Sequence, residues 1–488
     1  MTTSQTTTVP GSTVAARPSF KDRYDHYIGG RWAPPESGDY FDNISPIDGK
    51  VFSRVACGNA RDIEKAIDAA HAAFPLWSKS SGAYRHDLLL KIAEVIAANQ
   101  DYLAAVETID NGKPIRESRN ADVPLMVDYF RYFAGAVEND EEVIDEHNDM
   151  VVGIDMHDPI GVVGQIIPWN FPLLMAASKI APALAAGCCV IVVPAAQTPV
   201  SILCLMELIG DLIPPGVLNI VTGNGPETAR LLSGSRRISI PDPLSEPRGS
   251  SVNIFFESVA ESDDEFFDKA IEGALMFAFN KGEVSIRPSR ILVHEKIYEQ
   301  FINRVLERVE SIKLGNPLDS TVMMGAQVSA DQYDKVLQYI RIGKQEGARV
   351  LCGGEAFHQN SGLEHGYYVK PTLFGGFNKM RIFKENIFGP VSCVTTFGST
   401  DEAIAIANDT LYGFGAGVWT RDARILYTVP RSVRAERVWV NCFPAYRSPF
   451  GGFEKPAFGA EARKEVLARY RQTKNVLISF SNDRLGFF

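Results

Sequence analysis

The sequence predicts an α/β protein built on a doubly wound parallel sheet, followed by a second α/β unit. Short β-branched runs alternate with helical segments from 161 to 221, and a similar alternation resumes after residue 252. Regular alternation of strands and helices is typical of parallel sheets. The chain has 488 residues, of which 45% are hydrophobic. That length and composition suit two or three domains with large apolar cores.

The first alternating stretch and the helices before it can be placed from their hydrophobic periods. We expect helices within 61–111 and over 121–139, 172–186 and 200–213, and strands over 161–167, 188–193 and 217–221. The apolar run 180–193 is too short to span a bilayer, so a buried helix leading into a buried strand is the interpretation. Parallel sheets bind ligands at the carboxyl ends of their strands.

The second unit has the same pattern and ends in a strand. We expect strands over 253–256, 290–293, 393–397 and 438–441 and helices over 265–279, 297–312 and 330–346. A terminal strand over 476–481 needs a partner, which another subunit could supply. Between the two units, 233–251 holds three prolines and no periodicity, which predicts an irregular loop. The acidic run 138–149 is expected to be a solvated face or a loop.

Composition excludes several classes of function. The net charge of -10 and the absence of a basic run argue against nucleic-acid or membrane partners. Seven cysteines at irregular spacing, without a CxxC pair, argue against disulfides or a metal site and predict a cytoplasmic location. Residues 1–18 are rich in Thr and Ser and lack the apolar stretch of a secretory signal, so we expect a disordered tail.

Several ordered motifs resemble the aldehyde dehydrogenase superfamily from about residue 20 onward. The motifs are IGGRW at 28–32, PIGVVGQIIPWNFP at 159–172, NIVTG at 219–223, FNKGEVSIRPSR at 279–290, IFGPV at 387–391, RVWVN at 437–441 and QTKNVLISFS at 472–481. The resemblance implies an aldehyde dehydrogenase-like fold with a Rossmann-like domain, a second α/β catalytic-type domain and a β oligomerisation element. The implied bounds are a tail over 1–19, a cofactor-binding-type domain over 20–138 and 160–252, oligomerisation strands over 139–159 and 468–488, and a catalytic-type domain over 253–467.

The family activity that the resemblance implies is oxidation of an aldehyde to an acid with NAD or NADP. A cysteine thiolate attacks the aldehyde, hydride leaves to the nicotinamide, and a glutamate activates water. The motif places that cysteine at Ser285, and the chain has no cysteine between Cys204 and Cys352. A hydroxyl does not ionise near neutral pH and needs a base. Ser285 is therefore either a weak nucleophile or a small polar residue that fills the position.

The resemblance assigns two further catalytic positions. Asn170 stands where the family asparagine donates its amide to the developing oxyanion, and it could equally be a turn residue. Glu246 aligns with the general base. The family sequence there is ELGG, whereas Pro247 follows here and fixes the backbone. The alternative for Glu246 is a solvated loop glutamate.

The cofactor positions depart furthest from the family pattern. Val193 and Ala196 occupy the positions of a lysine and a glutamate that bind the adenine ribose, and Asn386 replaces a second ribose-binding glutamate. Residues 240–245 replace a strand, a Gly-Ser turn and the helix that receives the pyrophosphate, so we expect the Rossmann-like sheet to lose a strand and a helix. The remaining cofactor-facing positions are Ile166, Trp169 and Phe388. These losses predict that no cofactor binds.

Three hypotheses about function follow. The first is a pseudoenzyme that serves as a structural or regulatory subunit, in a homodimer or dimer-based oligomer or in a mixed oligomer with an active aldehyde dehydrogenase. The second is an active enzyme, either an NAD(P)-dependent aldehyde oxidoreductase or a weak esterase that uses Ser285. The third is a protein that binds a small molecule in a tunnel lined by Trp169, Phe171, Met175 and Phe450.

Overall fold

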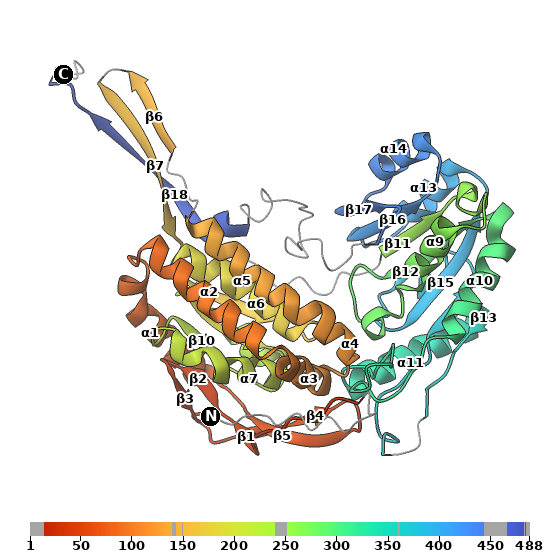
Figure 1. Ribbon diagram of the computed structural model, residues 1–488, viewed down its shortest axis with the longest axis horizontal. Helices are drawn as coiled ribbons and strands as arrows, with labels where there is room; N and C mark the ends of the chain where they lie inside the picture. The colour runs from red at the N-terminus through yellow and green to blue at the C-terminus, as the bar shows by residue number, and fades with distance from the viewer. Residues whose placement is uncertain are drawn as a thin grey trace.

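The chain folds into two lobes joined along one side, and a narrow β-sheet extends from the first lobe (Figure 1). The structure is a computed structural model that describes residues 14–138, 143–148, 150–239, 251–358, 362–443, 466–482 and 484. Both lobes combine a sheet with covering helices, so the α/β prediction is confirmed.

The first lobe contains a five-stranded sheet with the order β3-β2-β10-β9-β8. Its strands are β2 (His26–Ile28), β3 (Arg31–Ala33), β8 (Val162–Ile167), β9 (Cys189–Pro194) and β10 (Leu218–Ile220). The strands β8, β9 and β10 are parallel, whereas β2 is antiparallel to both of its neighbours, β10 and β3. Every residue of β9 is buried, which is why its sequence is continuously apolar rather than alternating.

Helices cover this sheet on both faces and bury its apolar side chains in one core. They are α1 (Ala60–Trp77), α2 (Gly82–Ala98), α3 (Gln100–Asn111), α5 (Val123–Glu138), α6 (Pro172–Ala186), α7 (Val200–Ile209) and α8 (Pro226–Ser233). The helix α6 begins at a proline, whose missing amide is not needed there, and ends at Gly187 with a φ of 88°. The predicted apolar run is thus the end of α6 and β9. No helix in the described ranges is long and apolar enough to cross a membrane.

The second lobe contains a seven-stranded sheet with the order β13-β14-β15-β12-β11-β16-β17. Its strands are β11 (Ser251–Phe255), β12 (Pro288–His294), β13 (Arg349–Cys352), β14 (Thr372–Gly375), β15 (Val391–Phe397), β16 (Gly415–Trp419) and β17 (Arg437–Val440). Its helices are α9 (Glu265–Leu275), α10 (Tyr298–Glu310), α11 (Ala330–Gln345), α12 (Arg381–Lys384), α13 (Thr400–Asn408) and α14 (Ala423–Ser432). Only β13 is antiparallel to its neighbour.

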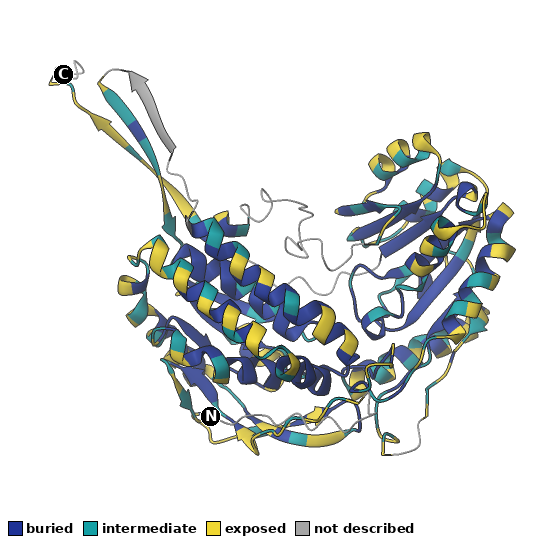
Figure 2. Ribbon diagram, in the orientation of Figure 1, coloured by how far each residue is buried: buried dark blue, intermediate teal, exposed yellow. Residues whose placement is uncertain are grey.

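Two small sheets complete the described fold. One has the order β1-β5-β4, with β1 (Arg23–Tyr24), β4 (Tyr40–Ser45) and β5 (Lys50–Ala56). The other is the narrow three-stranded sheet that extends from the first lobe, with the order β18-β7-β6. It is formed by β6 (Val143–Asn148), β7 (Val151–Pro159) and β18 (Arg471–Ser479). Figure 2 shows that β18 is exposed along most of its length.

Some local predictions were wrong. The run 138–149 contains β6 rather than only a loop, because β7 supplies a strand partner that charge patterning does not reveal. The alternative of a solvated face stays a prediction, since the burial of these side chains lies outside what the structure describes. The terminal strand finds its partner within the same chain, since β18 pairs antiparallel with β7 along its whole length. Residues 1–13 of the predicted tail lie outside the described residues; beyond them, Val14 bridges Asp319 and the Ala15 amide donates to the Leu318 carbonyl.

The sequence predicts that the sheet of the first lobe lacks a strand and a helix beyond the outer edge of β8. The Ser239 amide donates to the Val162 carbonyl and the Gly164 amide donates to the Ser239 carbonyl, both at 2.9 Å. Residues 240–250, which include Glu246, lie outside the described residues. Loss of a strand and a helix therefore stays a prediction, as do the domain boundaries.

A cluster of buried charges lies where α3 meets α5. The Lys113 Nζ lies 2.6 Å from Asp122 Oδ2 and 3.0 Å from Glu107 Oε1, and all three side chains are fully buried. The intervening chain forms α4 (Ile115–Glu117) and a π-helical turn (Ser118–Asp122). A buried ion keeps its charge only through such partners, because leaving water costs several kcal/mol.

We expect Lys113→Met to lower the free energy of unfolding by roughly 3–5 kcal/mol, because two buried carboxylates lose their cation. Lys370→Met is the matched control, since the ion pair between Lys370 and Glu355 is solvent-exposed and should contribute little. Urea denaturation followed by tryptophan fluorescence would measure both variants. Equal unfolding midpoints for the two variants would contradict the prediction.

Candidate functional site

The two segments that the sequence singles out meet at the junction of the lobes. The first is the turn 168–171 between β8 and α6, which carries Trp169 and Asn170. The second is the segment 279–287 before β12, which carries Ser285. The Asn170 Nδ2 donates to the Glu283 carbonyl at 3.1 Å, and the Asn280 Nδ2 donates to the Asn170 carbonyl at 2.9 Å. The structure thus brings Asn170 against a residue two positions before Ser285.

Ser285 is half-buried at the amino end of β12. The Ser251 hydroxyl donates to the Ser285 carbonyl at 3.1 Å, which fixes the backbone beside the first residue of β11. Within the described ranges the Ser285 hydroxyl has no hydrogen-bond partner, so no base contacts it there. Glu246 and Phe450 both lie outside the described residues.

Asn170 is half-buried and has its amide orientation set by the Glu283 carbonyl. A primary amide has two N–H donors. One of them is used by Glu283, and the other has no acceptor within the described part of the chain. That second donor is available to a substrate oxygen.

Four cysteine thiols in the described part of the chain are buried. They are Cys188, Cys189, Cys204 and Cys393. Burial raises the pKa of Cys188 to about 11 and those of Cys189 and Cys204 to about 12. The Cys188 thiol also donates to the Tyr470 carbonyl at 3.2 Å. A thiol that stays protonated is a poor nucleophile.

Aromatic and apolar side chains lie near the carboxyl end of β8, at positions where the family resemblance places cofactor contacts. The rings of Trp169 and Phe388 meet edge to face at 5.3 Å, and half-buried Ile166 is the last residue but one of β8. Phe388 has a φ of 56°, in the left-handed region, and its carbonyl accepts a hydrogen bond from the Gln332 Nε2 at 2.7 Å. Val193 is buried and apolar at a position where the resemblance places a ribose contact. The resemblance places the pyrophosphate-binding element at residues 240–245, which lie outside the described ranges.

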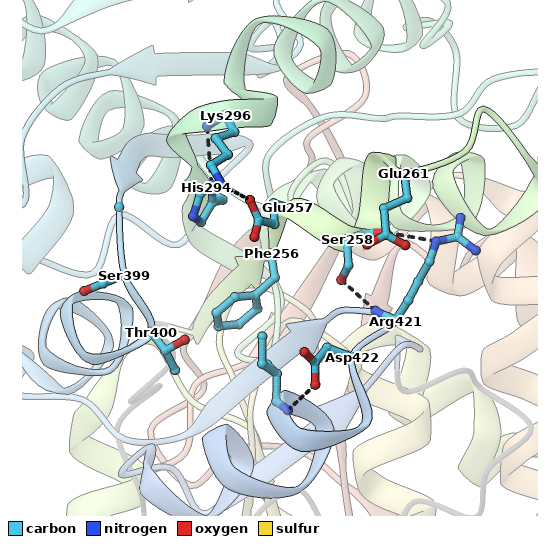
Figure 3. A pocket seen from close by; sticks show the side chains of 12 residues that line it. Phe256, Glu257, Ser258, Glu261, His294, Lys296, Ser399, Thr400, Arg421 and Asp422 are labelled. Atoms are coloured by element: carbon cyan, nitrogen blue, oxygen red, sulfur yellow. Dashed lines mark hydrogen bonds and ion pairs between the residues drawn. The ribbon is translucent and has the colours of Figure 1, made fainter.

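A cavity of about 430 Å³ lies elsewhere, at the carboxyl ends of β11, β12, β15 and β16 (Figure 3). Its wall includes Phe256 and His294, and His294 is the last residue of β12. Ser285 precedes the first residue of that strand, so the length of β12 separates the cavity from the site loop. The Glu257 carboxylate in the cavity is paired with Lys296 at 2.6 Å. Sequence patterns did not indicate this cavity.

Comparison with known proteins identifies the class. The model of the aldehyde dehydrogenase family matches residues 32–240 and 246–476. The chain belongs to the aldehyde dehydrogenase family, and the family fold expected from the motifs is confirmed. The match is interrupted at 241–245, inside the segment predicted to be an irregular loop.

The chain is similar over nearly its whole length to named enzymes. It is 51% identical to an aldehyde dehydrogenase of Deinococcus radiodurans, over 98% of this chain and 96% of the relative. It is 52% identical to acetaldehyde dehydrogenase 2 of Cupriavidus necator, over 96% of this chain and 97% of that protein. A long-chain-aldehyde dehydrogenase of an Acinetobacter species is 51% identical with the same coverage.

Solved structures of other proteins have the same fold as this chain. HpcC from Thermus thermophilus superposes with a TM-score of 0.88 at 31% identity, over 96% of this chain and 95% of that chain. The NAD+ complex of an aldehyde dehydrogenase from Bacillus cereus superposes with a TM-score of 0.85 at 32% identity, over 94% of this chain and 97% of that chain.

These findings correct two expectations. The pseudoenzyme hypothesis is wrong, because relatives about half identical over almost the whole chain are named aldehyde dehydrogenases. The expectation of no cofactor is also wrong, because the family and its NAD-bound structures indicate NAD or NADP. The cofactor error came from giving single positions, such as Val193 and Ala196, more weight than the similarity of the whole chain to the family.

Glu117 connects this site to the buried charges of the first lobe. Its Oε1 accepts the Asn280 backbone amide at 3.3 Å, and burial raises the pKa of Glu117 to about 8 from an ordinary 4.5. The folded state therefore holds the proton at pH values where the unfolded chain has released it. Stability from this group is present below its unfolded pKa and is lost as the pH rises through about 8.

We expect Glu117→Gln, which cannot ionise, to flatten the fall in stability between about pH 5 and about pH 8.5. Glu299→Gln, at an exposed position, is the control and should leave the pH profile unchanged. Thermal unfolding across this range would measure all three proteins. A Glu117→Gln profile as steep as that of the wild type would show that another group causes the fall.

Proposed function

We propose that the chain oxidises an aldehyde to a carboxylic acid with NAD or NADP. The observation that carries the proposal is the roughly half-identical match, over nearly the whole chain, to enzymes named for acetaldehyde and long-chain aldehydes. The free Asn170 donor beside the Ser285 loop supports it, because such a donor can stabilise oxygen charge during reaction.

The proposal assigns Ser285 the position at which the family resemblance places a cysteine. A serine there is compatible with oxidation, because aldehydes in water form hydrates, R–CH(OH)2. Loss of one hydride and one proton converts a hydrate directly to the carboxylic acid, without a thiolate. Nicotinamide supplies the hydride acceptor when NAD or NADP is bound.

Each site residue receives a role in this scheme. The free Asn170 N–H and the Ser285 hydroxyl bind the two oxygens of the hydrate, and Glu246 accepts the proton. Trp169, Phe388 and Ile166 hold the nicotinamide half of the cofactor. The wall of Trp169 and Phe388 also excludes water from the reacting face, which strengthens the hydrogen bond from Asn170.

We expect the purified chain to form NADH or NADPH from acetaldehyde or a long-chain aldehyde, measured by absorbance of the reduced nicotinamide. Asn170→Ala should lower kcat by roughly 100-fold or more, since one preorganised donor is lost. Asn378→Ala is the control, because the Asn378 Nδ2 donates to Asp409 in an exposed part of the second lobe.

Different experimental results would contradict different parts of this proposal. No reduced nicotinamide with either aldehyde and either cofactor would reject the proposal. Cofactor-independent ester hydrolysis that disappears in Ser285→Ala would instead establish the esterase alternative. Equal activity of Asn170→Ala and Asn378→Ala would remove Asn170 from the mechanism.

For assembly, we propose a homodimer or dimer-based oligomer joined through the extending sheet. The sheet exposes an edge of β18 and several large apolar side chains (Figure 2). Leu477 is 63% exposed and Phe480 is 62% exposed, and Met150 and Met156 also lie at its surface. An unpaired strand edge with apolar side chains favours pairing with a second chain. A mixed oligomer with another family member would use the same edge.

We expect wild-type protein to be dimeric or larger by light scattering, and Leu477→Glu/Phe480→Glu to shift it toward monomer. Charges placed on the apolar surface would have to be buried in the assembly. Leu411→Glu is the control, because Leu411 is 97% exposed on the second lobe. A monomeric wild-type protein at micromolar concentration would refute the assembly.

A further inference from the structure

Lys281 is a fully buried lysine between the two segments of the candidate site. Its Nζ lies 2.6 Å from Asn111 Oδ1, 2.8 Å from the Asn111 carbonyl and 2.8 Å from Glu283 Oε2. Desolvation lowers the pKa of Lys281 and raises that of Glu283, so burial opposes the charged pair while these contacts support it. The ammonium therefore depends on three oxygens held at fixed positions.

The backbone of this segment is also constrained. Asn280 has a φ of 42° and Lys281 a φ of 60°, in the left-handed region that side chains other than glycine rarely adopt. The Gln327 Nε2 donates to the Lys281 carbonyl at 3.1 Å, which helps to hold this geometry. At the next residue, Gly282, a Cβ would lie 2.1 Å from the Gly389 carbonyl. Residues with unfavourable dihedrals persist only where the surrounding contacts determine them.

The partners of Lys281 reach both segments. The Asn111 Nδ2 donates to the Trp169 carbonyl at 2.7 Å. The Asn170 Nδ2 donates to the Glu283 carbonyl at 3.1 Å, and the Glu283 Oε1 accepts the Val328 amide. The contacts form a closed circuit, from Lys281 through Asn111 to the 169–170 turn and back through Glu283. Hence one ammonium fixes both the backbone that carries Asn170 and the carbonyl that orients its amide.

We propose that Lys281 is a positioning residue, which aims the free Asn170 N–H at the substrate oxygen by holding Asn111 and Glu283 in place. The inference rests on the proposed aldehyde oxidation for its kinetic consequence. Its structural consequence is independent of activity, because the circuit contains only side chains and backbone of this chain. Lys281 does not touch substrate in this scheme and acts through Asn170.

The kinetic test is a double-mutant cycle. We expect Lys281→Met to lower kcat by roughly 100-fold, with KM changed by about threefold or less, since a small misplacement of a catalytic group has that effect. In an Asn170→Ala background the same substitution should cost about threefold or less in kcat, because the group that it positions is gone. Lys281→Gln, whose amide can still donate to Asn111, should recover part of the loss.

Arg290→Met is the matched control. Arg290 is also a buried cation, but its guanidinium donates to the Ile406 and Ala407 carbonyls, away from the site loop. A general loss of stability should affect this variant as much as Lys281→Met. A specific loss of kcat should be confined to Lys281→Met.

Hydrogen exchange provides a readout besides activity. We expect faster exchange of the amides around 169–175 and 283–287 in Lys281→Met and not in Arg290→Met. If Lys281→Met fails to fold, Lys281→Gln carries both measurements. Additive kinetic losses in the double mutant, or unchanged exchange at both segments, would overturn the proposal. Unaltered exchange rejects the positioning role even if the wild type is inactive, whereas inactivity together with altered exchange rejects the proposed function alone.

Discussion

The candidate site depends on hydrogen bonds that cross from one lobe to the other. Ser285 follows a segment of the second lobe, yet Asn170 and Glu117 of the first lobe bond directly to that segment. The segment has two left-handed residues in succession, a conformation that it would not hold alone. The geometry of the candidate site therefore depends on contacts between the two lobes. Each lobe determines the backbone geometry of the other at the point where they meet.

Sequence patterns predicted the local elements well and the long-range polar contacts poorly. β8 and β9 were recognisable because a buried parallel strand is a continuous β-branched run bounded by turns. Lys113 and Lys281 gave no such signal, because a lone charged residue in a sequence is expected to be solvated. Some partners, such as Glu107 and Glu283, are near in sequence and one, Asn111, is distant, and hydrophobic periodicity carries no information about any of these pairings. The same limit explains why β6 was missed, since its acidic sequence needs β7 beside it to form a strand.

The error about function has a chemical origin. In the mechanism that the family resemblance implies, a thiolate attacks the aldehyde, so a serine at the cysteine position predicted that the reaction is lost. Oxidation of a hydrate reaches the same carboxylic acid with the same electron balance and requires only a bound hydride acceptor and a proton acceptor. A substitution such as serine at 285 removes one route and leaves the overall reaction possible. The position of Ser285 in the family motif stays a prediction, and it does not exclude the oxidation.

Under the proposed function, the main contribution of this chain is a hydrogen-bond donor fixed before substrate arrives. One Asn170 N–H is committed to the Glu283 carbonyl, so the amide plane and the direction of the second N–H are both determined. A donor held in this way needs no reorganisation when charge develops on the substrate oxygen, and exclusion of water increases its effect. Such stabilisation does not depend on whether the neighbouring residue is serine or cysteine. The buried charges beneath the loop are then explained as the source of rigidity for that amide, because an apolar core at Lys281 would leave the Asn111 and Glu283 oxygens without a cation.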